Sequence, residues 1–141
     1  MFKKTLGIVT AAVALTALLP MGTAQAASCK GSGCTGKNPQ ATGCGADAYT
    51  LKGSRVTPAG GGPAVELRVS PSCSAAWARI QKANSNWRFK LEIKNRSPYT
   101  EHASPNHQAY TAMVWNSHAY RACVEQYDGA SGSWTCSTKW F

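Results

Sequence analysis

Six cysteines are the residues of this sequence whose chemistry is most easily named. Three of them lie in the glycine-rich stretch CKGSGCTGKNPQATGC, residues 29–44. A zinc site would need close C-x2-C pairs or a finger-like Cys/His set, a redox motif would need C-x-x-C, and the sequence has neither. An even cysteine count in a small exported chain predicts structural disulfides instead, with no metal and no cofactor. The six are Cys29, Cys34, Cys44, Cys73, Cys123 and Cys136.

One cysteine pair has a local argument. The segments AYRACVEQY and SWTCSTKWF flank residues 128–131, which have the composition of a turn. A hairpin there places Cys123 opposite Cys136, within reach of a disulfide. Six cysteines allow about 15 pairings, and the sequence leaves the other two bridges open, with Cys44–Cys73 preferred.

Catalytic chemistry has fewer candidates. His102, His107 and His118 are the only histidines, and a nuclease-like hydrolase could use such groups for general acid–base catalysis. However, His102 and His107 lie in a stretch rich in Pro, Ser and Asn that is typical of a solvated loop, and His118 is equally compatible with a turn. No G-x-S-x-G motif is present, and the six carboxylates are scattered singly. Whether the protein is an enzyme stays open, and we expect binding rather than catalysis.

Cations and aromatic rings suggest a binding surface. In NWRFKLEIK, residues 86–94, apolar and polar residues alternate, which predicts a strand with one buried and one solvated face. Aromatic rings stack on sugars or bases, and nearby cations hold phosphates. An ordinary solvated face is the competing interpretation. The predicted binding residues are Arg88, Lys90, Lys94, Arg96, Trp134 and Trp140.

The N-terminus predicts export. Lys3 and Lys4 precede a 14-residue apolar run, residues 6–19, and Ala24-Gln25-Ala26 resembles a cleavage site. This order is typical of a signal peptide, residues 1–26, and the run is too short to span a bilayer. The remaining residues, 27–141, are expected to form one secreted domain without a transmembrane segment. The formal net charge of +9 falls to +7 when the two lysines are removed, which favours anionic partners.

The elements that must position these side chains are mostly strands. Alternation predicts strands over residues 65–69 and 86–94, and the apolar residues 110–115 are expected to form a central strand. Residues 70–83 begin with helix-start signals but also alternate, so we favour a short helix or a turn, passing into a strand. Other predicted elements are a short strand or turn at 48–51, a polar connection at 97–108, and a terminal hairpin of residues 119–127 and 133–140. The expected fold is mainly β: a small antiparallel barrel or sandwich with at most one short helix, held by disulfides around a Cys/Gly-rich loop region at 27–47.

The sequence also resembles a known family. The resemblance rests on four pieces of the sequence: Cys29, Cys34, Gly36, Pro39, Cys44 and Asp47-Ala48; residues 65–80, with the block L-R-x-S-x-x-C-x-x-x-W-A-R; residues 110–114; and Ala122-Cys123. These pieces are similar to the YjfA-type family of small secreted Gram-positive proteins. That family is a domain of unknown function, so the resemblance implies export and no activity. Asn38 departs from the aspartate expected before the proline. Related domains are associated with actinobacterial proteins that carry a DNA-binding domain and a membrane helix, which implies a sensing or binding module.

These observations favour a secreted or wall-associated basic module that binds an anionic or carbohydrate polymer of the cell envelope. Nucleic acid is a further partner through non-specific charge. The alternatives are a histidine-dependent secreted hydrolase and a secreted inhibitor or antimicrobial factor. The sequence does not indicate an oligomeric state.

Overall fold

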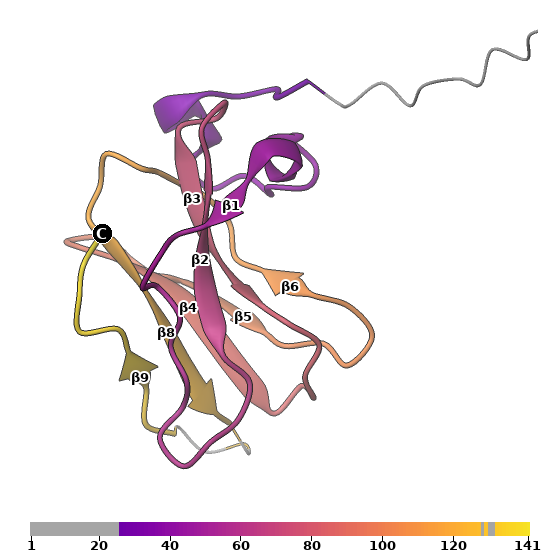
Figure 1. Ribbon diagram of the computed structural model, residues 1–141, viewed down its shortest axis with the longest axis vertical. Helices are drawn as coiled ribbons and strands as arrows, with labels where there is room; N and C mark the ends of the chain where they lie inside the picture. The colour runs from indigo at the N-terminus through magenta and orange to yellow at the C-terminus, as the bar shows by residue number, and fades with distance from the viewer. Residues whose placement is uncertain (1–25, 128, 130–131) are drawn as a thin grey trace, which may run out of the picture.

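Two antiparallel sheets face one another in the computed structural model, which describes residues 26–127, 129 and 132–141 (Figure 1). Sheet A has the order β1-β2-β3-β6, with β7 also paired to β3, and sheet B has the order β5-β4-β8-β9. The strands of sheet A are β1 (Tyr49–Thr50), β2 (Val65–Ser70), β3 (Ala75–Ile80), β6 (Ala109–Tyr110) and β7 (Val114–Trp115). Those of sheet B are β4 (Trp87–Ile93), β5 (Tyr99–His102), β8 (Tyr120–Gln126) and β9 (Thr135–Cys136).

The described residues contain no α-helix, only the short 3-10 helices η1 (Gly31–Cys34) and η2 (Cys44–Asp47). In this part of the chain, no helix has the length and apolar character needed to cross a membrane. The predicted signal peptide lies outside the described residues except for Ala26, as do residues 128, 130 and 131 of the predicted hairpin turn.

The main core lies between the two sheets. Leu67 and Ile80 of sheet A meet Phe89, Leu91 and Val124 of sheet B, and all five are fully buried. They occupy alternate positions of β2, β3, β4 and β8, because successive side chains of a strand point to opposite faces. The mainly β fold class is therefore confirmed, and the arrangement is a sandwich.

Sheet A is covered on its outer face as well. Trp77 and Met113 pack there against Cys34, Cys44 and Cys73, in a second buried cluster formed with the N-terminal loop. The Cys44–Cys73 disulfide ties that loop to the turn between β2 and β3. Strand β3 is consequently buried on both faces, while the outer face of sheet B has no such cover from the N-terminal loop.

The structure corrects two predicted elements. The helix alternative for residues 70–83 is wrong, since residues 71–74 form a turn and β3 follows. Residues 110–115 do not form one central strand but lie along the edge of sheet A as β6 and β7. The chain leaves the sheet between them because the backbone of Met113 pairs with Gly36 and Lys37 of the N-terminal loop. That loop also explains why this edge segment is apolar on both faces.

The polar connection predicted for residues 97–108 contains a strand that the sequence pattern does not reveal. Strand β5 pairs with β4 at the open edge of sheet B, in register from Leu91↔Tyr99 to Arg88↔His102. Three of its four residues are exposed, so no alternation of apolar and polar residues marks it.

Candidate binding site on the outer face of sheet B

Strand β4 divides its side chains between the core and the outer face of sheet B. Phe89, Leu91 and Ile93 are buried between the sheets, and Arg88 and Lys90 alternate with them. Because the strand alternates strictly, its basic side chains stand in a row along the outer face.

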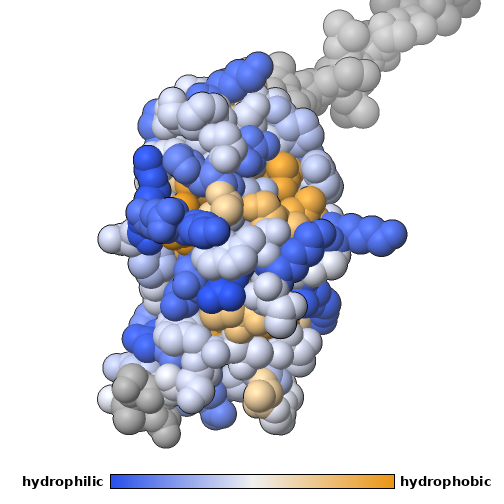
Figure 2. Space-filling view, turned by 90° about the vertical axis from the view of Figure 1, so that its left-hand side faces the viewer, coloured by the Kyte–Doolittle hydropathy of each residue, from blue (hydrophilic) through white to orange (hydrophobic). Residues whose placement is uncertain are grey.

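The C-terminal segment lies across this row. Strand β9 pairs with β8 through only two residue pairs, Cys123↔Cys136 and Val124↔Thr135. The Cys123–Cys136 disulfide that the hairpin register predicts is present, with a Cα–Cα distance of 4.0 Å. Figure 2 looks onto the side where β9 and the C-terminus lie, and it shows strongly hydrophilic side chains around small hydrophobic patches.

Two tryptophans of this segment stack with cations. Lys90 Nζ lies 4.4 Å from the centroid of the Trp134 ring, and the guanidinium carbon of Arg88 lies 5.6 Å from it. The Arg121 guanidinium lies 4.5 Å from the ring centroid of Trp140. These distances are within the range of cation–π contacts, so each of the two rings is held beside a cation of sheet B.

Trp140 also forms one wall of a shallow groove of about 670 Å³, which we call the basic groove. Lys90 lines it from β4, and Lys94 and Arg96 line it from the turn that follows. Asn95 has a φ of 63° in that turn, a left-handed conformation that Asn tolerates well. The complete lining is Lys90, Glu92, Ile93, Lys94, Asn95, Arg96, Ser97, Pro98 and Trp140.

Ion pairs divide the basic side chains of this surface into two groups. Arg88 is paired with Glu125, and Arg121 Nε lies 3.0 Å from Glu92 Oε2. Lys90, Lys94 and Arg96 form no ion pair with any carboxylate in the described ranges. The positive charge of these three side chains is therefore available to a ligand, and it is concentrated at the basic groove.

The three histidines are not brought together at this groove. His102 is exposed on β5, with Nδ1 3.1 Å from the carbonyl oxygen of Ser85. His107 is exposed, and His118 lies edge-on to Trp115, with ring centroids 6.1 Å apart. None of the three lines the basic groove. Histidine-dependent hydrolysis stays a prediction.

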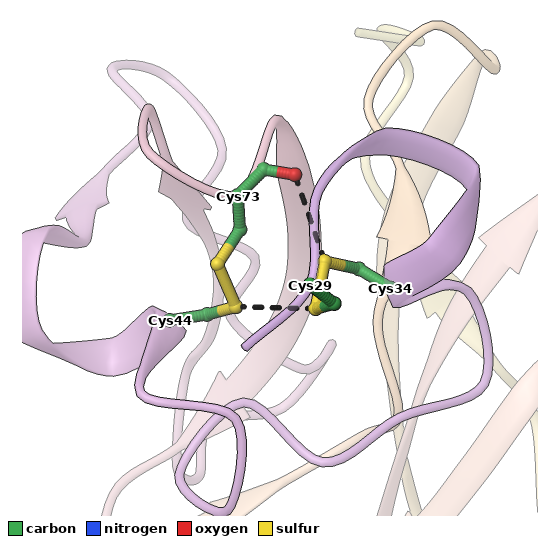
Figure 3. A group of neighbouring side chains, drawn as sticks. All are labelled: Cys29, Cys34, Cys44 and Cys73. Carbon is green, nitrogen blue, oxygen red and sulfur yellow. Dashed lines mark hydrogen bonds between the residues drawn. A yellow bond between two sulfur atoms is a disulfide. The ribbon is translucent and has the colours of Figure 1, made fainter. Parts of the chain in front are cut away.

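The remaining four cysteines meet at the opposite end of the fold from β9. Cys29, Cys34 and Cys44 belong to the N-terminal loop, and Cys73 belongs to the turn between β2 and β3 (Figure 3). They form the Cys29–Cys34 and Cys44–Cys73 bridges, and the Sγ atoms of Cys29 and Cys44 are 3.7 Å apart. All four sulfur atoms lie within 4.8 Å of one another. Each is nevertheless bonded to another sulfur, so none is the thiolate that binds a metal.

Asp47 has a structural role next to this cluster. Its carboxylate accepts hydrogen bonds from Ser70 Oγ (2.6 Å) and from the backbone N–H of Ser72 (2.8 Å). Burial raises the pKa of Asp47, but these hydrogen bonds outweigh it and the pKa is lowered overall. Asp47 therefore caps the turn between β2 and β3.

Sequence reasoning missed two contributors to the outer face of sheet B. The centroid of the Tyr127 ring lies 3.8 Å from the guanidinium carbon of Arg88, and the same guanidinium group also contacts the Trp134 ring. Glu125 is buried although it belongs to the outer face. Strand alternation in β8 could have placed Glu125 opposite Arg88, but only the path of the C-terminal segment buries it.

The family comparison covers most of the fold just described. A family model described as a protein of unknown function, DUF2690, matches residues 32–124. No curated protein and no solved structure matches the chain. The matched range includes both sheets except the last two residues of β8 and all of β9, and it ends before Trp134 and Trp140. The chain belongs to the DUF2690 family of proteins of unknown function.

Proposed function

We propose that this protein is a secreted, YjfA-type module that binds an anionic polymer of the bacterial cell envelope. The ligand lies along the outer face of sheet B, with its acidic groups at the basic groove. The observation that carries the proposal is the groove itself, where Lys90, Lys94 and Arg96 lack acidic partners among the described residues and Trp140 supplies an aromatic wall.

An extended ligand fits this surface better than a small molecule does. Pockets for small molecules are concave and mostly apolar, and they enclose most of the ligand, whereas this groove is shallow and has basic side chains on an exposed turn. Lys90 and Lys94 are four residues apart on one strand and its end, or about 13 Å at the usual rise per residue. A chain with repeated negative charges can meet both at once.

Two tryptophan rings add stacking surfaces to the positive charge of this face. Trp134 and Trp140 are each half-buried and held beside a cation. Such rings stack on sugar rings as well as on bases. A wall polymer that combines phosphate or carboxylate groups with sugars uses both features, whereas a nucleic acid would be attracted mainly by charge.

The test is retention on purified cell wall, before and after its anionic polymers are extracted. The wild-type protein should bind intact wall at low salt, release as salt rises, and bind extracted wall weakly, because ionic contacts between exposed groups are screened. The variant Lys94→Gln/Arg96→Gln should bind about tenfold more weakly, which corresponds to about 1.4 kcal/mol.

The matched control is Lys52→Gln/Arg55→Gln, which removes the same charge from two exposed residues that do not line the groove. It should retain near-normal affinity. Equal losses in the two variants would mean that net charge alone drives retention, and tighter binding to nucleic acid than to wall polymer would indicate a different ligand. A wild-type protein that is not retained on intact wall at low salt would reject the proposal.

A further inference from the structure

A second hollow lies at the other end of β4 from the exposed basic turn. It has a volume of about 230 Å³, and we call it the polar hollow. Trp87 provides an aromatic wall, and Gln126, Ser133 and Thr135 provide amide and hydroxyl groups. Its complete lining is Pro58, Ala59, Trp87, Glu125, Gln126, Ser133 and Thr135. None of these residues belongs to the basic groove.

Glu125 also lines this hollow, and its side chain carries a hydrogen-bond acceptor that no described residue uses. Its side chain is fully buried, and Oε1 accepts a hydrogen bond from Arg88 Nε at 2.7 Å. Oε2 is buried as well and accepts no hydrogen bond from the described residues. A buried polar atom without a partner costs roughly 1–3 kcal/mol, so a ligand group that donates to Oε2 would recover part of that free energy.

The walls of the hollow are held in place. Gly62 packs so closely on Trp87 that a Cβ atom there would lie 2.5 Å from the ring, and its φ of 137° also favours glycine. The hydroxyl of Thr135 accepts a hydrogen bond from the Ala59 backbone N–H at 3.3 Å, which ties β9 to the same loop. These contacts fix the positions of Trp87, Ala59 and Thr135 in the lining of the polar hollow.

We infer that the polar hollow binds one sugar ring of the same anionic polymer, an inference that rests on the proposed function. The ring lies against Trp87, its hydroxyls bond to Gln126, Ser133 or Thr135, and one hydroxyl donates to Glu125 Oε2. A neutral sugar fits better than an amine, because the Arg88 guanidinium already pairs with this carboxylate. The ligand class is therefore a polyanion with sugar substituents on its repeating units.

The position of the hollow allows one chain to reach both sites. Trp87 lines the polar hollow and Lys90 lines the basic groove. They are three residues apart on β4 and point to opposite faces of sheet B, so the connection between the two sites runs through the C-terminal segment. Ser133 of the hollow directly precedes Trp134, which contacts Lys90. A sugar in the hollow and a phosphate at Lys90 can thus belong to neighbouring units of one polymer.

The experiment compares two probes with the same poly(glycerol phosphate) chain, one bearing glucosyl substituents and one bare. Dissociation constants are measured by calorimetry for the wild-type protein, Ala59→Trp and Gln126→Ala. We expect the wild-type protein to bind the glucosylated chain about tenfold more tightly. Ala59→Trp fills the hollow from an exposed position, so it should abolish this preference and keep the affinity for the bare chain. Gln126→Ala should reduce the preference by a smaller factor.

The outcomes separate this inference from the proposed function. If the wild-type protein binds both probes equally, or if correctly folded Ala59→Trp keeps the preference, the sugar site is wrong and the proposed function stands. If the wild-type protein binds neither probe, the proposed function fails and this inference fails with it. Near-UV circular dichroism checks that each variant keeps the wild-type fold.

Discussion

The Cys123–Cys136 disulfide should hold the aromatic half of the candidate site in place, and its removal tests this directly. Without the bridge, the C-terminal segment keeps the two residue pairs of β9 with β8 and the backbone hydrogen bonds that Ser137 and Phe141 make with Ala122 and Tyr120. The cysteines are 13 residues apart in the sequence, and closing a loop of that size contributes about 3 kcal/mol to stability in the chain-entropy model. We therefore expect Cys123→Ala/Cys136→Ala to lower the free energy of unfolding by about 3 kcal/mol.

The same variant should lose more binding than stability alone explains. Trp134 and Trp140 are placed beside their cations by the segment that this bridge anchors. Once the bridge is lost, the segment is held only by hydrogen bonds, and each ring loses part of its order, which must be restored on binding at a cost of about 0.5–1.5 kcal/mol per side chain. Affinity for wall polymer should therefore fall by about tenfold, under conditions in which the domain remains folded.

The matched control is Cys44→Ala/Cys73→Ala, which removes a bridge on the opposite sheet. Its cysteines are 29 residues apart, so its loss should cost somewhat more stability, about 3.5 kcal/mol. Its effect on affinity should be small, because this bridge holds the N-terminal loop over sheet A. Urea unfolding and calorimetry give the two quantities for each variant. If the Cys44/Cys73 variant loses as much affinity as the Cys123/Cys136 variant, the assignment of the site to sheet B is wrong.

Two further predictions concern buried polar groups. Burial, with a smaller contribution from Tyr49, raises the pKa of Tyr120 from 10.0 to about 12. Folding therefore favours the neutral phenol of Tyr120. The stability that this preference contributes is fully present below pH 10 and is lost as the pH rises toward 12. The free energy of unfolding, measured with urea at pH 9 and at pH 11.5, should fall between these pH values by about 2 kcal/mol more in the wild-type protein than in Tyr120→Phe. Identical losses in the two proteins would contradict this. Arg88→Met should destabilise the protein by about 3 kcal/mol, because it leaves the buried Glu125 carboxylate without its partner. The double variant Arg88→Met/Glu125→Leu should recover most of that loss, and a double variant as unstable as the single one would refute the explanation.

Local patterns in the sequence predicted a substantial part of this molecule. Alternation in residues 86–94 predicted β4 with its buried and basic faces, and the spacing about residues 128–131 predicted that Cys123 meets Cys136. The row formed by Arg88 and Lys90 follows from that alternation alone. These predictions succeed because a strand has a period of two, and a hairpin fixes which residues are opposite each other.

Long-range contacts decided the rest. The segment 110–115 is apolar because the N-terminal loop packs on it, and β5 is a strand only because β4 offers it an open edge. Glu125 looks like an ordinary polar residue of a strand until the C-terminal segment covers it. The sequence by itself determined the Cys123–Cys136 pair, the basic character and the alternating faces, since these depend on neighbours along the chain. Only the tertiary structure decided which cations lack acidic partners, which rings stand beside them and where the two hollows lie, because those properties depend on residues that are distant in sequence and meet only when the sheets pack.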